Sequence, residues 1–299
     1  MKQKTLTLKQ LYKVGTVKLA EEGIEEFSLD AWYLLEYVTG VSKAMYFAEP
    51  ERAVSEENAD RYIDCIRRRA AHIPLQHITG EQEFMGYPFC VNEHVLIPRQ
   101  DTEILVEEAI QVMRPKMKVL DMCTGSGCIV LSILKMCREK YYMTDLQGIG
   151  ADVSEEALKV ARENGRRLGV PVTWIQSDLF AKIPEEEKYD VIVSNPPYIE
   201  TAVIDTLQEE VRLHDPYIAL DGKEDGLYFY RRIISEAGKY LKTQGKLMFE
   251  IGCDQAEAVE ELMKNAGYEQ ITVKKDLAGL DRVVSVSYTH LTLPTICSV

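Results

Sequence analysis

The 299-residue sequence lacks the features that mark membrane, secreted and zinc-binding proteins. No apolar stretch approaches the roughly 20 residues that a membrane-spanning helix needs. Residues 1–4 are basic but lead into alternating Thr and Leu without a signal-peptide core. The seven cysteines are odd in number and show no Cys-x-x-Cys spacing, which fits free thiols better than disulfides or a zinc site. We therefore expect a cytoplasmic globular protein with no membrane segment and no metal.

Basic residues are also too few for a broad nucleic-acid-binding surface. The chain has 35 Lys and Arg against 48 Asp and Glu, a formal net charge of −13. Residues 1–80 are nearly neutral, so almost all of this charge falls on the remainder. Nucleic-acid binding draws on Lys and Arg that neutralise phosphates. The run Arg67–Arg69 is a local exception, but its helical pattern favours a solvated face. No direct nucleic-acid contact is expected.

The first 77 residues predict a small helical bundle. Apolar residues recur at three- and four-residue spacing, which predicts helices at residues 6–22, 28–40 and 55–71. Ser28 and Ser55 precede two of these runs as candidate N-caps. Gly23 and Gly40 fall where helices should end. No strand pattern is found in this segment.

After residue 77 the pattern changes to strands. Glycines and prolines punctuate residues 78–100, which predicts a connector resembling a β-hairpin, and residues 102–113 predict a helix capped by Asp101 or Thr102. Strands are expected at residues 118–122, 147–152, 172–176, 189–194, 246–251, 270–273 and 282–286. Helices are expected between most of them, at residues 129–137, 155–168, 226–240 and 255–266. Residues 101–285 therefore predict a doubly wound, seven-stranded and mainly parallel sheet, with the carboxyl ends of its strands at one edge.

The first predicted strand ends in a turn of small residues, Cys123-Thr124-Gly125-Ser126-Gly127. Such a turn lets a ligand approach the backbone closely. It has no Gly-Lys-Ser/Thr of a Walker loop, and it lacks the third glycine of the dinucleotide fingerprint. Alone, the turn fits ligand binding and simple strand–helix packing equally well.

Acidic residues end the next two predicted strands. Asp152 could accept both hydroxyls of a ribose, as in nucleotide-binding α/β folds, and Asp178, which precedes Leu179, could accept an adenine amino group. The alternative is that these acids cap helices, as Asp152 with Ser154 would do. The turn, the two acids and the motif that follows each come directly after a predicted strand, and such a regular arrangement argues against coincidence.

The segment Asn195-Pro196-Pro197-Tyr198 follows the predicted strand 189–194. Asn195 offers a side-chain carbonyl, and the two prolines have no backbone N–H, so the carbonyls here are expected to be free acceptors. Tyr198 would supply a flat wall. This combination suits a planar –NH2 group held by both hydrogens. The alternative is a Pro-Pro turn capped by Asn195.

This register resembles the class I S-adenosylmethionine-dependent methyltransferases, whose first strand ends in Asp-x-Gly-x-Gly-x-Gly. Cys123 replaces the first glycine of that pattern. In that superfamily an Asn-Pro-Pro-Tyr motif marks transfer to the nitrogen of an amide or an exocyclic amine. Further segments make the chain similar, over about residues 8–285, to the bacterial release-factor glutamine methyltransferases (the HemK/PrmC family). These segments lie at residues 74–80, 83–87, 96–103, 211–216, 219–222, 225–227, 249–252 and 280–284.

The resemblance implies N5-methylation of the glutamine in the Gly-Gly-Gln motif of class-1 peptide-chain release factors, with S-adenosyl-L-methionine as methyl donor. It implies that the cofactor is held by residues 123–127, Asp152, Asp178, Leu179 and Asn195, and that residues 195–198 bind the glutamine amide. Asn195, Pro196 and Tyr198 would be the catalytic residues. The helical bundle, residues 1–77, would grip the release factor, and we expect a monomer.

Two departures from the family pattern accompany these expectations. Leu179 stands where some members carry an aromatic residue, so aliphatic contact would replace stacking on the adenine. Gln100 replaces a usual proline. His214 and Glu250 lie near the motif in sequence, but nothing requires either as a proton acceptor.

Two other functions remain open from the sequence. An N6-adenine methyltransferase of DNA or RNA would use the Asn-Pro-Pro-Tyr motif in the same way. It would also need a basic recognition region, and base flipping if its substrate were a duplex. A catalytically silent binding domain is the other alternative, and the intact motif with both acids argues against it. Cofactor affinity, together with methyl transfer to a release factor or to an oligonucleotide, distinguishes all three.

Residues 286–299 are expected to be a non-native tail. Residues 286–295 do not resemble the end of this family, and they back-translate into a sequence similar to a transposon-based sequencing adapter read in frame. The natural last strand would then continue differently after Val284. A natural β-rich terminus is the alternative, and sequencing of the genomic locus decides between the two.

Overall fold

The computed structural model describes residues 6–288, which form two compact units. The first unit contains residues 6–81 and Gln208–His214. The second contains Gln82–Leu207 and residues 215–288. No helix among the described residues combines the length and the apolarity needed to cross a membrane. Nor does any group of three His, Cys, Asp or Glu in that part of the chain have an arrangement that could hold a metal ion.

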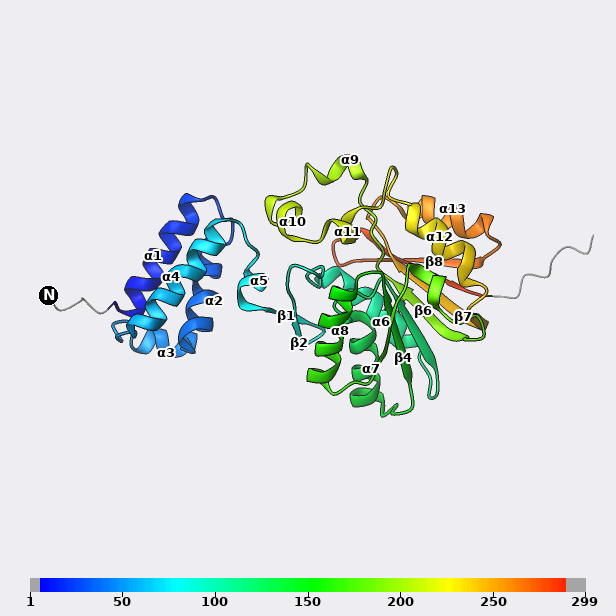
Figure 1. The fold of residues 1–299 in the computed structure, drawn as a ribbon, viewed down its shortest axis with the longest axis horizontal. Helices are drawn as coiled ribbons and strands as arrows, with labels where there is room; N and C mark the ends of the chain where they lie inside the picture. Colours follow the sequence, from blue (N-terminus) through cyan, green and yellow to red (C-terminus); the bar gives the residue numbers. More distant parts are fainter. Residues whose placement is uncertain (1–5, 289–299) are drawn as a thin grey trace, which may run out of the picture. The chain divides into compact units, whose positions relative to one another are not determined.

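The first unit is helical (Figure 1). Its main helices are α1 (Leu8–Glu21), α2 (Phe27–Thr39), α3 (Lys43–Ala48), α4 (Glu56–Ala70) and α5 (Leu75–Thr79). Their apolar faces meet in a core where Leu11, Leu34 and Leu35 are fully buried. α1 packs closely on α4 at Gly15, because any side chain there would collide with the Tyr62 hydroxyl. The helical bundle predicted from the sequence is confirmed.

The helix ends are mostly those that the sequence predicts. Ser55 caps α4 by accepting from the Asn58 N–H, and Gly40 ends α2 with a left-handed φ of 66°. The expectation that Ser28 caps α2 is wrong, because that helix begins at Phe27. Ser28 lies in its first turn, with its Oγ 2.8 Å from the Tyr12 hydroxyl oxygen. Because the helix starts one residue earlier than predicted, Ser28 makes a packing contact instead of an N-cap.

The short helix α10 (Glu209–His214) belongs to the first unit although it follows β6 in the chain. Arg69 of α4 accounts for this grouping. Its Nε donates to Asp30 Oδ2 at 2.6 Å, and its Nη2 donates to Glu210 Oε1 at 2.5 Å. Arg69 is only 5% exposed, so the expectation of a solvated face for Arg67–Arg69 is wrong at this residue. The domain boundaries expected at residues 77 and 100 left α10 inside the catalytic segment.

A hairpin of β1 (Glu81–Phe84) and β2 (Tyr87–Cys90) leads into the second unit, as the sequence predicts. The Phe84 and Phe89 rings pack edge to face in its core, 6.0 Å apart. A 3-10 turn, η1 (Gln100–Thr102), then precedes α6 (Glu103–Val112). Thr102 stands at the start of α6, but its side chain makes no cap and is left for another contact.

The second unit contains the predicted seven-stranded sheet. Its strands are β3 (Lys118–Met122), β4 (Gln147–Asp152), β5 (Thr173–Gln176), β6 (Tyr189–Ser194), β7 (Leu241–Glu250), β8 (Glu269–Lys275) and β9 (Asp281–Ser287). They lie in the order β5-β4-β3-β6-β7-β9-β8. The pairs from β5 to β7 are parallel, whereas β9 is antiparallel to both neighbours.

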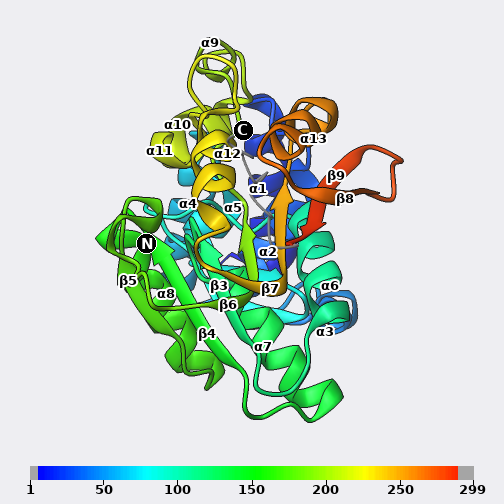
Figure 2. The same cartoon turned by 90° about the vertical axis from the view of Figure 1, so that its right-hand side faces the viewer.

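Both faces of the sheet are covered by helices. Consecutive residues of β3 point to opposite faces, and Val119 and Leu120 are each fully buried in a different core. The covering helices are α7 (Cys128–Tyr141) with α6 on one face, and α12 (Tyr228–Ala237) with α13 (Ala256–Asn265) on the other (Figure 1, Figure 2). α8 (Glu155–Leu168) links β4 to β5. The doubly wound architecture is therefore confirmed.

The strand order creates a crevice beside β3. The chain passes from β3 to β4 and β5 in one direction, then returns to β6 on the other side of β3. Ligands in open α/β sheets bind outside the carboxyl ends of the strands at such a switch point. Two short helices that the sequence did not predict, α9 (Thr201–Ile204) and α11 (Tyr217–Leu220), follow β6.

The last strand reaches into the segment expected to be non-native. Val286 pairs with Leu247 and is 1% exposed, and β9 ends at Ser287. Residues 286 and 287 therefore complete an inner strand that pairs with β7 and β8, whatever their origin. Residues 289–299 of the expected tail lie outside the described part of the chain. That the tail is foreign stays a prediction.

Candidate active site

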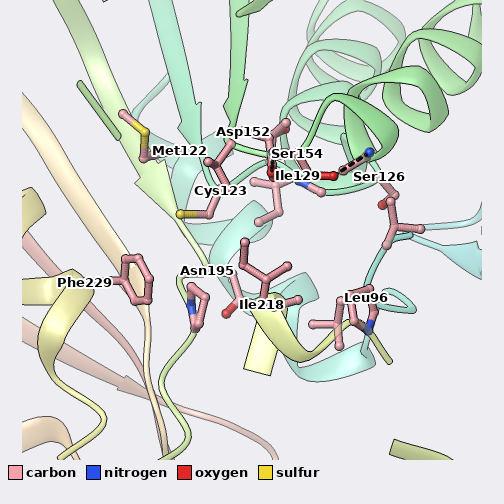
Figure 3. A pocket seen from close by; sticks show the side chains of 18 of the residues that line it. Leu96, Met122, Cys123, Ser126, Ile129, Asp152, Ser154, Asn195, Ile218 and Phe229 are labelled. Carbon is pink, nitrogen blue, oxygen red and sulfur yellow. Dashed lines mark hydrogen bonds between the residues drawn. The ribbon is translucent and has the colours of Figure 1, made fainter. Parts of the chain in front are cut away.

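A cavity of about 340 Å³ opens in the second unit at the carboxyl ends of β3, β4 and β6 (Figure 3). This volume falls in the range of small-molecule sites. Asp152 and Ser154 lie on one side of the cavity and Asn195 on another, with Cys123 between them (Figure 3). Leu96 and Ile218 add apolar lining, Ile218 from α11 (Figure 3).

Most of the predicted site residues meet at this cavity. Those that line it are Cys123, Thr124, Gly125, Ser126, Asp152, Asp178, Leu179, Asn195 and Pro197. Gly127, Pro196 and Tyr198 do not line it. Further lining residues that the sequence reasoning missed come from other elements, among them Thr102, Phe229 and Arg232. Their sequence carries no recognisable motif, so only the fold brings them here.

The turn after β3 has a strained backbone that suits close approach. Cys123, Gly125 and Gly127 all adopt left-handed φ values, of 60°, 54° and 78°. A non-glycine residue in this region costs roughly 1–2 kcal/mol, so Cys123 is held there by its surroundings. Gly125 faces open space, whereas a Cβ on Gly127 would lie 2.8 Å from Trp174 Cη2. Gly127 is therefore needed for helix packing beneath the turn.

Asp121, the last but one residue of β3, supports this turn from below. Its Oδ2 accepts from Thr124 Oγ1 at 2.6 Å and from the Val130 N–H at 3.3 Å. Its Oδ1 is buried and has no partner among residues 6–288. Burial raises the pKa of Asp121 to about 7, although the bonds from Thr124 and Val130 oppose the shift. The sequence reasoning treated Asp121 only as part of the strand.

Asp152 braces the turn from the neighbouring strand. Its Oδ2 accepts from the Gly125 N–H at 2.9 Å, and its Oδ1 accepts from the Ser154 N–H at 2.9 Å. Burial raises the pKa of Asp152, against the effect of these bonds. The helix cap itself is Ser154, whose Oγ accepts from the Ala157 N–H. Since a carboxylate has about four acceptor positions, Asp152 retains some for a ligand.

Asp178 and Leu179 lie beyond β5. Asp178 Oδ1 accepts from Arg232 Nη1 of α12 at 2.8 Å, and the Asp178 side chain is 57% exposed. Leu179 has a left-handed φ of 49°. Its side chain is buried in the apolar core and also lines the cavity. The expected contact of these two residues with an adenine stays a prediction.

Asn195 reaches the cavity from the end of β6. Its Nδ2 donates to Thr102 Oγ1 at 3.4 Å. No backbone N–H of the described residues donates to the Pro196 carbonyl. The expectation that all carbonyls of this segment are free is wrong at Tyr198, whose carbonyl accepts from Gln255 Nε2 at 3.0 Å. The Tyr198 ring packs against the core instead of lining the cavity.

Two glycines hold the backbone of Tyr198 in place. A Cβ on Gly222 would lie 2.7 Å from the Tyr198 carbonyl carbon. A Cβ on Gly226, whose φ is 69°, would lie 2.4 Å from the Tyr198 carbonyl oxygen. The sequence flagged both Asp-Gly pairs as family segments but gave no reason for them. The reason is close packing on the Asn-Pro-Pro-Tyr segment.

The residues at the cavity fit S-adenosylmethionine. Gly125 leaves open space beside the turn, and Asp152 keeps acceptor capacity for ribose hydroxyls. Leu179 and Phe229 add apolar surface to the cavity. These features suit a ligand with a ribose, a base and an amino-acid portion.

Known proteins share both units of this chain. Residues 10–80 match the PrmC N-terminal domain, and residues 113–285 match a methyltransferase domain family. The chain is 39% identical over 284 residues to the release factor glutamine methyltransferase of Caulobacter vibrioides, covering 94% of this chain and 96% of that protein. It is 40% identical over 271 residues to that of Clostridium acetobutylicum, covering 89% and 93%.

One solved structure shows a similar fold at low identity. The hMettl16 catalytic domain, solved in complex with the MAT2A 3′UTR hairpin 6, has a TM-score of 0.52 and 16% identity, covering 82% of this chain and 88% of that chain. The likeness to that domain concerns the fold alone. The identity to the full-length relatives confirms the resemblance found in the sequence: the chain belongs to the release factor glutamine methyltransferase family of S-adenosylmethionine-dependent methyltransferases.

Proposed function

We propose that this protein transfers the methyl group of S-adenosylmethionine to the side-chain amide nitrogen, N5, of the glutamine in the Gly-Gly-Gln motif of a class-1 release factor. The observation that carries the proposal is the position of Asn195. It lines the cavity that fits the cofactor, and it belongs to a segment whose Pro196 carbonyl receives no backbone donor from residues 6–288. One acceptor therefore lies at the cofactor-sized cavity, and the next residue in the chain offers a second.

The chemistry explains why two acceptors matter. When bound, S-adenosylmethionine supplies an electrophilic methyl group on a sulfonium; residues 123–126, Asp152, Asp178 and Leu179 would hold it. An amide nitrogen is a poor nucleophile because its lone pair is delocalised. The Asn195 side-chain oxygen and the Pro196 carbonyl would accept its two N–H groups and fix its direction. Such positioning lowers a barrier by several kcal/mol, and acceptors aimed at N–H groups that become more acidic add an electrostatic contribution.

No strong general base is required by this arrangement, because the amide nitrogen becomes acidic once it carries the methyl group. His214, considered from the sequence as a proton acceptor, does not line the cavity. Glu250 does not line it either. The chain itself therefore binds and orients the amide, and the proton leaves after transfer.

The choice of acceptor is tested with labelled cofactor. We expect label to enter a release factor but not a variant factor in which the glutamine of Gly-Gly-Gln is replaced by Glu, because Glu has no amide nitrogen. A single-stranded and a duplex oligonucleotide containing adenine are offered in parallel. Label in the oligonucleotide and none in the factor would establish the N6-adenine alternative and overturn the proposal.

We further propose that the first unit contacts the release factor and that the enzyme acts as a cytoplasmic monomer. Large exposed apolar side chains support the contact, among them Tyr33 and Tyr37 of α2 and Phe47 of α3, which is 70% exposed. An exposed apolar surface of this kind is typical of a protein interaction site. The acidic balance of the chain outside residues 1–80 also suits a partner whose RNA-binding surfaces are basic.

A further inference from the structure

Glu250 is a buried carboxyl group directly behind Asn195. β6 and β7 are parallel neighbours, and Ser194 pairs with Phe249, so Asn195 and Glu250 are the next residues of the two strands. Glu250 is 2% exposed and does not line the cavity. A buried carboxylate without compensation is costly. Its presence at this position therefore calls for a role.

The hydrogen bonds of Glu250 point to that role. Thr102 and Asn195 are the hydrogen-bonding neighbours of its carboxyl group, and Asn195 Nδ2 also donates to Thr102 Oγ1. Glu250 Oε2 has no partner among the described residues and is free to accept. An ionised carboxylate can only accept hydrogen bonds. It therefore holds the –NH2 end of the Asn195 amide, and the C=O end is left available to a ligand. A flipped Asn195 would present its –NH2 to the acceptor –NH2, donor against donor.

We propose that Glu250 is a positioning residue that fixes the orientation of the Asn195 amide and thereby selects an acceptor that donates two N–H groups. The inference rests on the proposed function, because it assigns the Asn195 oxygen to the glutamine amide. Glu250 acts through Asn195 and Thr102 and does not touch the substrate. Protonated Glu250 gains a donor, which can bond to the Asn195 oxygen and stabilise the flipped amide.

The surroundings of Glu250 place its titration in an accessible range. Burial raises the pKa of Glu250 to about 7, and Asp101 adds to the shift, while Thr102, Arg282 and Asn195 oppose it. The charge of Arg282 is shared, because its Nη2 lies 3.1 Å from Asp101 and 3.0 Å from Asp276. The other titratable groups facing Glu250 are Tyr198, Tyr230 and Cys128, whose pKa values burial raises, so they stay neutral. Glu250 is thus an acceptor above about pH 7 and a donor below it.

The kinetic test compares the wild-type enzyme with Glu250→Gln. Steady-state methylation of a release factor is measured from pH 5.5 to 8.5. We expect kcat of the variant to fall about tenfold, equivalent to about 1.4 kcal/mol, with little change in KM or in cofactor affinity by calorimetry. We expect the wild-type profile to fall on the acid side of about pH 7, and this limb to vanish in the variant. Glu269→Gln, an exposed glutamate at the start of β8, is the matched control and should behave as wild type.

The possible failures are distinguishable. A wild-type enzyme that methylates no release factor refutes the proposed function. Wild-type activity with an unchanged Glu250→Gln profile refutes the positioning role, and so does a lower kcat that keeps the acid limb.

A second measurement depends neither on activity nor on the Glu250→Gln variant. The side-chain NH2 signals of Asn195, assigned by their loss in Asn195→Asp, are followed by ¹⁵N NMR in the wild-type protein. They should shift with a midpoint near pH 7, whereas no shift between pH 5.5 and 8.5 overturns the inference.

Discussion

Two residues behind the cavity lining, Asp121 and Glu250, carry buried carboxyl groups to which the sequence motifs assign no role. Both have their pKa raised to about 7 by burial. The sequence shows which residues end the strands, because strand ends follow from apolar runs and small-residue turns. It does not show which carboxyl group lies beneath a turn with one oxygen unpartnered, as Asp121 does. That depends on the helix and the strands that close over it.

Asp121 should make the stability of the protein depend on pH. Its pKa is about 7 in the fold and near 3.8 when unfolded, so the folded state favours the protonated form. The contribution of Asp121 to stability therefore decreases as the pH rises from about 4 to 7, and is constant above that range. Asp121→Asn removes this loss. We expect the gain in unfolding free energy over wild type to be larger at pH 8 than at pH 5 by about 2 kcal/mol.

Urea unfolding at both pH values measures this difference. Asp205→Asn is the control, because Asp205 is exposed and lies outside the cavity. A gain from Asp121→Asn that is equal at pH 5 and pH 8 would show that the carboxyl group does not titrate in this window.

Among the elements, the long ones could be predicted and the short ones could not. β3, β4, β6 and α8 have the bounds expected from the sequence, because apolar runs and a strong helical period determine them. The short helices α3, α5, α9, α10 and α11 have too few turns to show a period. Ser28 misled the prediction of α2 because a serine is also acceptable in a first turn. The burial of Arg69 depends on Asp30 and Glu210, which are distant in sequence.

The turn from β3 to α7 should be far more sensitive at Gly127 than at Gly125. Both glycines have left-handed φ values, so alanine is strained at either position. Only at Gly127 would the new Cβ meet the Trp174 ring, the Leu131 side chain and the Ala161 Cβ. We expect Gly125→Ala to lose about 1 kcal/mol of stability and Gly127→Ala to lose about 2–4 kcal/mol from strain and overpacking together.

Urea unfolding gives the two stabilities, and calorimetry gives cofactor affinity. Gly127→Ala should also lower the affinity for the cofactor, because displacement of α7 moves the turn that lines the cavity. Gly125→Ala can change affinity directly, so the stability difference is the decisive comparison. Equal losses of stability in the two variants would mean that the Trp174 side chain moves aside without destabilising the fold.

For the whole molecule, the assignment of residues to a helical unit and to a unit with the cavity could be predicted only in part. The first 80 residues carry almost none of the net charge, and the second unit contains every residue that lines the cavity. The sequence separated a helical from a catalytic part because their periodicities differ. It did not predict that α10, encoded between β6 and β7, belongs with the helical unit. A short polar helix gives no indication of which unit it will join.

If the first unit contacts the release factor, its exposed aromatic residues should affect only the reaction with the intact protein. Tyr33 and Tyr37 lie one turn apart on α2 and are 45% and 46% exposed. Aromatic residues are frequent hot spots, each contributing about 1–2 kcal/mol or more. We expect Tyr33→Ser with Tyr37→Ser to raise KM for a release factor about tenfold or more, with kcat unchanged. Turnover of a short Gly-Gly-Gln peptide, which lacks the rest of the release-factor surface, should not change.

The chain offers a matched control for this pair in the other unit. Tyr141 and Tyr142 are 55% and 86% exposed at the end of α7 and lie outside the cavity lining. Tyr141→Ser with Tyr142→Ser removes the same chemical groups from the surface, so it corrects for any general effect of losing exposed tyrosines. An equal rise in KM from both pairs would remove the case for a docking role of α2. A rise for the short peptide as well would place the effect of Tyr33 and Tyr37 on the catalytic unit instead of on the contact with the release factor.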